Sequence, residues 1–185
     1  MKIINYITGN KSKFKIVKTF FKKQGIEIKQ KELPIYEIQS HDAIEITTSK
    51  ARQAWEIVKQ PLFVNDASWV IPSLKGFPGA YMKYINEWFR PEDFLNLMKD
   101  KKDRSIILRD TIIYIDENNQ NIFTNDHYGE ILKIPYTGDC KYPSDAIISL
   151  SKNKKSIAEE NDSNNFFTEG VWVDFANWLK NNENK

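Results

Sequence analysis

The stretch INYITGNKSKFKIV, from Ile4 to Val17, decides the fold because it combines an apolar run, a glycine turn and a helical pattern. The apolar run predicts a buried strand over Lys2–Ile7. The lysine-rich segment Lys11–Gln24 repeats its large apolar residues at helical spacing, and Gly25 follows where a helix C-cap belongs. The chain therefore opens with a strand, a tight turn and a helix.

A strand, a turn and a helix start form an anion site, because unpaired helix N–H groups and the positive dipole end face the turn. Thr8 and Asn10 can donate hydrogen bonds to a phosphate, Gly9 lets the backbone approach it, and Lys13 lies in the first helical turn. The spacing of a Walker A loop is absent. The plainer alternative is that Thr8 or Asn10 only caps the helix and that the lysines face solvent.

The rest of the chain alternates strand and helix patterns, which predicts an α/β fold with a long twisted sheet. An Asp42/Glu45 capping box opens a helix that stops before Pro61, and Leu62–Val64 forms a short strand that runs into Asn65-Asp66. The other predicted elements are strands at 26–33, 131–134 and 146–150, a hairpin of 105–115 with 121–128, helices after Pro78-Gly79, from Pro91 to about Lys99 and at 171–179, and a loop at 151–167.

The composition is typical of a folded globular protein. The chain has 185 residues, 41% of them hydrophobic, a net charge of +2 and one cysteine. This near-neutral charge gives no case for a nucleic-acid polymer or a membrane as partner. The start is too weakly apolar for a signal peptide, so we expect a soluble, cytoplasmic protein.

Several short motifs occur together in one order. They are TGNKSK at the first turn, LPIYEIQS, PLFVNDAS, LKGFPGAYMKY, a weaker YGEILKIPYTGDCKYPSD and SIAEE. Together they resemble the Ham1 or inosine triphosphate pyrophosphatase family over about residues 1–160. The resemblance implies a single domain over 1–185, with an elongated two-lobed fold, a mixed sheet flanked by helices, a central nucleotide cleft and a homodimer. It also implies Mg²⁺-dependent hydrolysis of noncanonical purine nucleoside triphosphates, such as ITP, dITP and XTP, to the monophosphate and pyrophosphate.

The same resemblance assigns roles to individual residues. Asp66 and Lys13 would be catalytic, with Asp66 orienting or deprotonating the attacking water, and Glu37 and Asp66 would hold Mg²⁺. The substrate contacts would come from Thr8, Gly9, Asn10, Lys13, Lys50, Ala67, Lys83, Tyr142 and Asp145. Each residue also has a plainer interpretation, as a surface acid, a helix cap, a solvated lysine or a core tyrosine. His41 and His127 match no metal-site spacing, and KDKKDR after Met98 is typical of a solvated face.

The chain departs from the family pattern at five places, one of which is YPSD at 142–145, where the glycine of the family's F-G-[YW]-D is missing. Ile16 replaces a glutamate, Asn65 replaces the first of two paired acids, and Ala67 replaces a serine or threonine. Loss of the acid at 65 predicts weaker Mg²⁺ binding. No Lys with a following Ser-His-Arg occurs near the C-terminus, which predicts an altered base preference.

Three functions remain open at this level. The first is the pyrophosphatase, and the second is a catalytically weakened nucleotide-binding or sensing module. The third is an interaction scaffold that uses the aromatic tail of Trp172, Phe175 and Trp178, although these side chains also suit a core.

Overall fold

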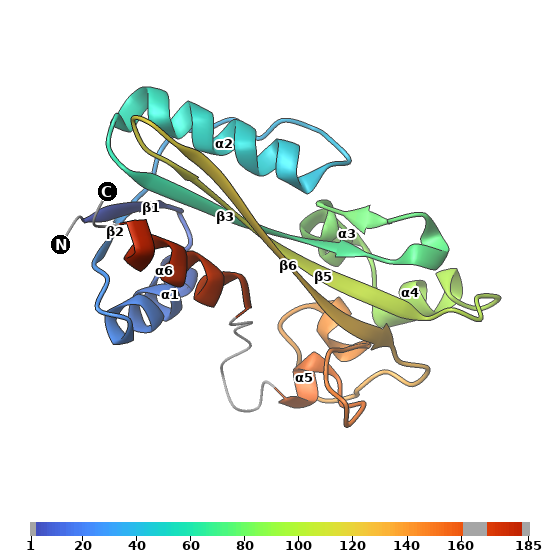
Figure 1. Cartoon of the computed structure of the whole chain (residues 1–185). Helices are drawn as coiled ribbons and strands as arrows, with labels where there is room; N and C mark the ends of the chain where they lie inside the picture. The colour runs from blue at the N-terminus through green and yellow to red at the C-terminus, as the bar shows by residue number, and fades with distance from the viewer. Residues whose placement is uncertain (1–2, 161–169, 183–185) are drawn as a thin grey trace. The chain divides into compact units, whose positions relative to one another are not determined.

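The structure, a computed structural model, describes residues 3–160 and 170–182 and contains a mixed sheet with helices on both faces (Figure 1). The strands follow the order β2-β1-β3-β5-β6-β7, and β4 pairs with β3. The elements are β1 (Ile4–Ile7), α1 (Lys11–Lys23), β2 (Ile28–Lys31), α2 (Ala43–Val58), β3 (Leu62–Val70), η1 (Pro72–Leu74), β4 (Pro78–Gly79), α3 (Met82–Trp88), α4 (Pro91–Leu97), β5 (Ser105–Ile115), β6 (Gln120–Ile131), η2 (Pro143–Ala146), β7 (Ile148–Ser149), α5 (Ile157–Glu160) and α6 (Gly170–Asn182).

The sheet mixes parallel and antiparallel neighbours, as the α/β prediction requires. β1 pairs in parallel with both β2 and β3, whereas β3–β4 and β6–β7 are antiparallel. Parallel neighbours need crossover connections, and α1 and α2 provide them. The α/β prediction with a mixed sheet is confirmed.

The chain divides into two compact units. The first contains Met1–Asp66, Asp110–Asn125 and Thr168–Lys185, and the second contains Ala67–Arg109 and Asp126–Phe167. β3, β5 and β6 each contribute residues to both units.

One face of the first unit has an aromatic core beneath α1 and α6 (Figure 1). Tyr6 stacks on Phe63 with ring centroids 4.5 Å apart, and Phe175 is fully buried 5.1 Å from Phe63. Trp172 is 3% exposed, and Trp178 packs 5.0 Å from Tyr114. The aromatic tail is therefore core, and its alternative use as a contact surface is wrong.

α2 covers the opposite face of the first unit. Its buried Ala51 and Ala54 pack against Leu62 and Val64 of β3 and against Ile113 of β5. Small residues on the helix let it lie close to the β-branched side chains of the sheet. In the part of β3 that belongs to the first unit, alternation thus directs Leu62, Val64 and Asp66 toward α2, and Phe63 toward α6 on the other face.

The second unit has its own core, built around residues of β3, α3, α4, β5 and β6. Phe94 of α4 is 1% exposed and Ile106 of β5 is fully buried. α3 also contacts η2, because the backbone N–H of Ser144 donates to Asn86 Oδ1 at 3.1 Å.

Most of the predicted elements are confirmed, and the differences have tertiary causes. β3 does not end at Val64 but continues to Val70, because Trp69 and Val70 pair with β4. The strand predicted at 131–134 is wrong, since β6 ends at Ile131. The loop predicted at 151–167 contains α5, while its residues 161–167 lie outside the described part of the chain.

At the start of α2, Asp42 is the N-cap and accepts a hydrogen bond from the N–H of Ile44 at 2.8 Å. Glu45 accepts from Ser40 Oγ instead of closing the predicted capping box. In the described part of the chain, no helix has both the length and the apolar character needed to cross a bilayer.

Candidate active site

The glycine turn between β1 and α1 is held by hydrogen bonds that also cap the helix. The N–H of Asn10 donates to Thr8 Oγ1 at 3.1 Å, and the N–H of Lys13 donates to Asn10 Oδ1 at 2.9 Å. Asn10 is therefore the N-cap of α1, as the plainer alternative holds. Only its side-chain oxygen is used in this bond, so its amide NH₂ group remains available to an anion.

Glu32 lies against the same turn, and the sequence analysis missed it. A Cβ built on Gly9 would lie 3.1 Å from Glu32 Oε1, closer than most Cβ contacts. Glycine thus permits the approach of this side chain. A carboxylate near a helix N-terminus is stabilised by the dipole and would compete with a phosphate for the same field.

Lys13 extends from the first turn of α1 toward β3. Its Nζ donates to the backbone oxygen of Asn65 at 3.4 Å. Burial lowers the pKa of Lys13, and the negative charges of Asp66 and Asp110 oppose that shift. Asp110 is only 7% exposed. A charged residue inside the apolar run of β5 was the available sequence signal for it, and the sequence analysis did not use that signal.

Lys50 of α2 joins the two predicted metal-binding acids. Its Nζ lies 2.7 Å from Asp66 Oδ2 and 2.5 Å from Glu37 Oε2. Burial alone would lower the pKa of Lys50, but the charges and hydrogen bonds of Asp66 and Glu37 outweigh it, so the pKa is raised. Glu37 and Asp66 therefore lie close enough together to share one cation.

Asn65 lies apart from this pair, although it precedes Asp66 in β3. The side-chain alternation of a strand directs it to the opposite face. Its Nδ2 donates to the backbone oxygen of Thr111 at 3.1 Å, and its Oδ1 has no hydrogen-bond partner among the described residues. The amide at 65 thus faces away from the Lys50–Asp66 pair, and the weaker Mg²⁺ binding expected from the sequence stays a prediction.

The remaining predicted residues belong to the second unit. Ala67 is an exposed residue of β3, and Lys83 is exposed on α3 with its Nζ 5.6 Å from the ring centroid of Tyr84. Tyr142 is 44% exposed at the start of η2, and the N–H of Asp145 donates to its backbone oxygen at 2.9 Å. Burial raises the pKa of Asp145 to about 6.

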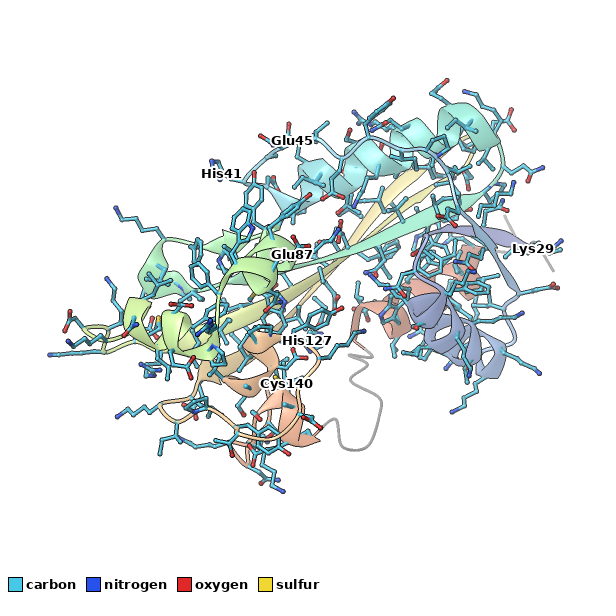
Figure 2. All side chains as sticks on the ribbon, turned by 180° about the vertical axis from the view of Figure 1, so that it is seen from behind. Lys29, His41, Glu45, Glu87, His127 and Cys140 are labelled. Atoms are coloured by element: carbon cyan, nitrogen blue, oxygen red, sulfur yellow. The ribbon has the colours of Figure 1, made fainter. Side chains whose placement is uncertain are left out.

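Glu37 and Asp66 are the two carboxylates of the first unit that could together bind a divalent cation, if phosphate oxygens and waters supplied its other ligands. No group of three or more His, Cys, Asp and Glu side chains suited to a metal occurs within residues 3–160 and 170–182. Mg²⁺ commonly needs only one or two carboxylates when phosphates and waters complete its shell. His41 precedes α2 and His127 lies in β6 (Figure 2), and neither belongs to the carboxylate pair.

This geometry defines an α/β protein whose first unit has a glycine turn at the N-terminus of α1, a partly buried lysine, Lys13, beside β3, and two carboxylates paired with Lys50. The chain belongs to the Ham1 family, whose model matches residues 4–165. The family predicted from the motifs is confirmed.

Relatives with assigned names agree with this membership. A dITP/XTP pyrophosphatase of Thermococcus kodakarensis is 28% identical over 180 residues, covering 96% of this chain and 97% of the relative. An inosine triphosphate pyrophosphatase of Fusarium vanettenii is 35% identical over 102 residues, covering 55% of this chain and 54% of the relative. The solved structure of a HAM1 protein from Coxiella burnetii shares the fold, with a TM-score of 0.81 and 20% identity over 98% of this chain and all of that one.

Proposed function

We propose that the protein is a nucleoside triphosphate pyrophosphatase that hydrolyses noncanonical purine triphosphates, such as dITP, XTP and ITP, to the monophosphate and pyrophosphate. Support comes from relatives with such names that align over nearly the whole chain. The observation that carries the proposal is the contact of Lys50 with both Glu37 and Asp66, in the same unit as the glycine turn and Lys13.

In this proposal, different residues of the first unit bind the triphosphate, activate the water and hold the metal ion. Asn10, with its free amide group, Thr8 and the Lys13 ammonium bind the triphosphate, and this binding orients the α-phosphorus. Asp66 accepts a proton from, or orients, the attacking water. Glu37 and Asp66 would hold Mg²⁺, which neutralises phosphate charge and polarises the oxygens of its ligands. Lys50 then turns from the carboxylates to a phosphate oxygen.

The resemblance also assigns substrate contacts to residues of the second unit. Lys83 adds a cation, Tyr142 presents an exposed ring for a base to stack on, and Asp145 lies beside it. Ala67 offers no hydrogen bond from its side chain. Binding in a cleft, the homodimer and an altered base preference stay predictions.

One observation favours a second candidate, a catalytically weakened nucleotide-binding module. The Lys50 ammonium occupies both carboxylates, so a divalent cation has to displace it before it can bind them. A protein in which displacement is unfavourable would bind nucleotides without cleaving them.

The deciding experiment measures pyrophosphate release from a panel of common and modified triphosphates, with and without Mg²⁺. We expect release from dITP or XTP that requires Mg²⁺ and that Asp66→Asn lowers by about 100-fold or more. Asp174→Asn, at an exposed position of α6 to which no role in the site is assigned, is the matched control. Full activity of Asp66→Asn would remove Asp66 from the mechanism. An absence of cleavage, with a nucleotide-dependent rise in Tm, would favour the binding module.

A further inference from the structure

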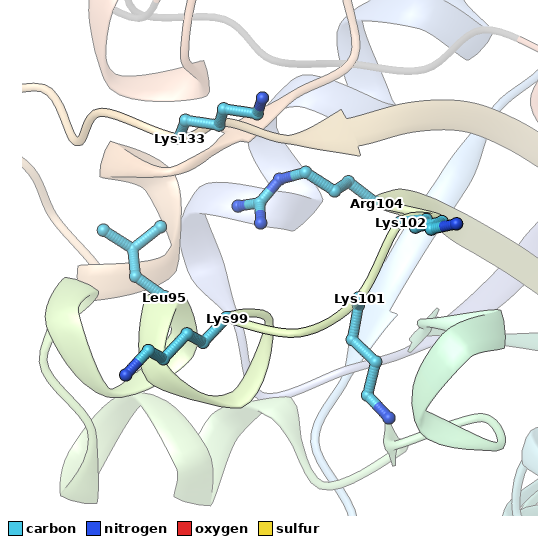
Figure 3. Close-up of a pocket in the computed structure, with 6 residues that line it drawn as sticks. All are labelled: Leu95, Lys99, Lys101, Lys102, Arg104 and Lys133. Atoms are coloured by element: carbon cyan, nitrogen blue, oxygen red, sulfur yellow. The ribbon is translucent and has the colours of Figure 1, made fainter.

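The second unit contains a cavity of about 470 Å³ whose lining is almost wholly cationic. Leu95 and Lys99 flank it from the end of α4, Lys101, Lys102 and Arg104 from the segment before β5, and Lys133 from the segment after β6. Figure 3 shows the Arg104 guanidinium extending into the space between Leu95 and Lys133, whereas the ammonium groups of Lys99, Lys101 and Lys102 point away from it. These residues include the KDKKDR segment, which the proposed reaction does not use.

Arg104 is held at this cavity by three backbone carbonyl oxygens of the described residues. Its Nε donates to the Ile131 backbone oxygen at 2.7 Å, and its two Nη atoms donate to Leu132 at 2.8 Å and Met98 at 3.3 Å. The guanidinium is therefore held in one orientation while its positive charge stays uncompensated by any carboxylate in these bonds. With five N–H donors in a fork, it keeps donors for a further acceptor.

The four lysines differ from Arg104, because they are exposed. None of their ammonium groups makes a hydrogen bond or an ion pair with the described residues. Asp100 and Asp103 lie in the same segment but do not line the cavity. Hydrogen bonds from the Ser105 side chain and from the Ser105 N–H, the latter at 2.8 Å, lower the pKa of the Asp103 carboxyl. Asp100 and Asp103 thus do not neutralise the cationic side chains that line the cavity.

We propose that this cavity binds a small linear polyphosphate, such as pyrophosphate or tripolyphosphate. An anion with several charges relieves the repulsion among the five cations, and lysines on flexible stems can turn inward onto it. Among the described residues, the lining has no aromatic ring on which a base could stack and has one apolar side chain, so it recognises a phosphate chain and not a nucleoside. This site is separate from the glycine turn, and the inference does not rest on the proposed hydrolysis.

Lysine footprinting with an acetylating reagent locates the binding, with the full chain in EDTA and inorganic tripolyphosphate as the probe. We expect tripolyphosphate to slow acetylation of Lys99, Lys101, Lys102 and Lys133 by about threefold or more, and to leave exposed Lys18 and Lys29 unchanged. Protection should decrease as KCl is raised, because salt screens exposed charges. Equal modification of the four lysines with and without the probe would overturn the proposal.

Calorimetry on a charge-neutralised variant gives the affinity. The combination Lys99→Gln, Lys101→Gln, Lys102→Gln and Lys133→Gln should weaken one tripolyphosphate-binding event by about tenfold or more. The control combination Lys18→Gln, Lys22→Gln, Lys23→Gln and Lys29→Gln makes the same charge change at exposed positions of the first unit. An equal loss of tripolyphosphate affinity in the two variants would show that net charge alone weakens binding. That result would reject the site. The contrary outcome is that an oligothymidylate binds more tightly than tripolyphosphate and protects the same lysines from acetylation. That outcome would overturn the proposal and show that these residues form a nucleic-acid-binding surface.

Discussion

At the scale of single residues, Lys50 holds the two carboxylates of the candidate site close together. Its ammonium contacts Glu37 and Asp66, whose side chains are 54% and 33% exposed. Two carboxylates near each other repel, so a cation between them stabilises the arrangement without any metal. Lys50 thus keeps the acids together before a divalent cation arrives and competes with it afterwards.

Replacing Lys50 by glutamine should strengthen Mg²⁺ binding in the absence of nucleotide. Removal of the competing charge from two partly exposed carboxylates is worth about 1 kcal/mol, or roughly a fivefold lower Kd for Mg²⁺. Isothermal titration calorimetry of Lys50→Gln measures this change. Lys59→Gln is the control, because Lys59 also pairs with a carboxylate, that of Glu56, at 2.8 Å. Weaker Mg²⁺ binding in Lys50→Gln would show that the ammonium does not compete.

Glu32 should oppose phosphate binding at the glycine turn. Its carboxylate lies beside Gly9 and the N-terminus of α1, where a triphosphate would place negative charge. We expect Glu32→Gln to lower the Kd for a nonhydrolysable triphosphate by about two- to fivefold at low salt, and by less at high salt. Exposed Glu27→Gln serves as the control in the same titration. An unchanged Kd at low salt would mean that phosphate does not bind at this turn.

At the scale of elements, local patterns predict the helices better than they predict the strands. α1 and α4 have the predicted starts because Asn10 caps α1 and Pro91 occupies the first turn of α4. β3 extends six residues past its predicted end at Val64, to Val70, because Trp69 and Val70 pair with β4. This pairing depends on residues outside β3, so the sequence of the strand alone does not predict it. The ranges of the hairpin strands β5 and β6 come close to the prediction, since adjacent strands pair locally.

In the candidate site, too, residues in local motifs could be predicted from the sequence, whereas residues brought close by the fold could not. The residues in short motifs, such as Thr8, Asn10 and Lys13, could be predicted from the sequence, and the structure places them at one turn. Glu32 could not, because its approach to Gly9 depends on how β2 lies beside β1. The separation of Asn65 from the acid pair likewise became clear only from the direction of its side chain.

The short element η2 should make stability depend on pH through Asp145. Burial raises the pKa of its carboxyl from 3.8 to about 6, although the Tyr142 backbone and the Lys141 charge oppose this. The folded state then holds the proton more tightly, so this contribution to stability is present below pH 4 and is lost as the pH rises through 6. Asp145→Asn should raise the free energy of unfolding by about 1–2 kcal/mol at pH 7.5, allowing for partial exposure, and by nothing at pH 4.

Urea unfolding of Asp145→Asn and the unsubstituted protein at pH 4, 5, 6 and 7.5 measures this dependence. Asp139→Asn, six residues earlier and exposed, should give parallel curves over the same range. A variant that is less stable at pH 7.5 would show that the Asp145 carboxylate stabilises η2 in its charged form.

At the scale of the whole molecule, two cores share three strands. The first core contains Phe175, and the second contains Phe94. Because β3, β5 and β6 contribute residues to both units, unfolding one unit would break strand pairing that continues into the other. The composition predicted a folded core, but only the contacts show that there are two and that α6 belongs to the first.

Truncation of either core phenylalanine should therefore destabilise the whole chain. Phe175→Ala and Phe94→Ala each remove a side chain that is at most 1% exposed, so we expect a loss of about 3–5 kcal/mol for either. Tyr36→Ala, at a position 83% exposed, should change the free energy of unfolding by less than about 0.5 kcal/mol. Urea unfolding followed by both circular dichroism and tryptophan fluorescence should show one coincident transition, moved to lower urea in both core variants. Two separate transitions, with Phe94→Ala moving only one of them, would mean that the shared strands do not couple the units.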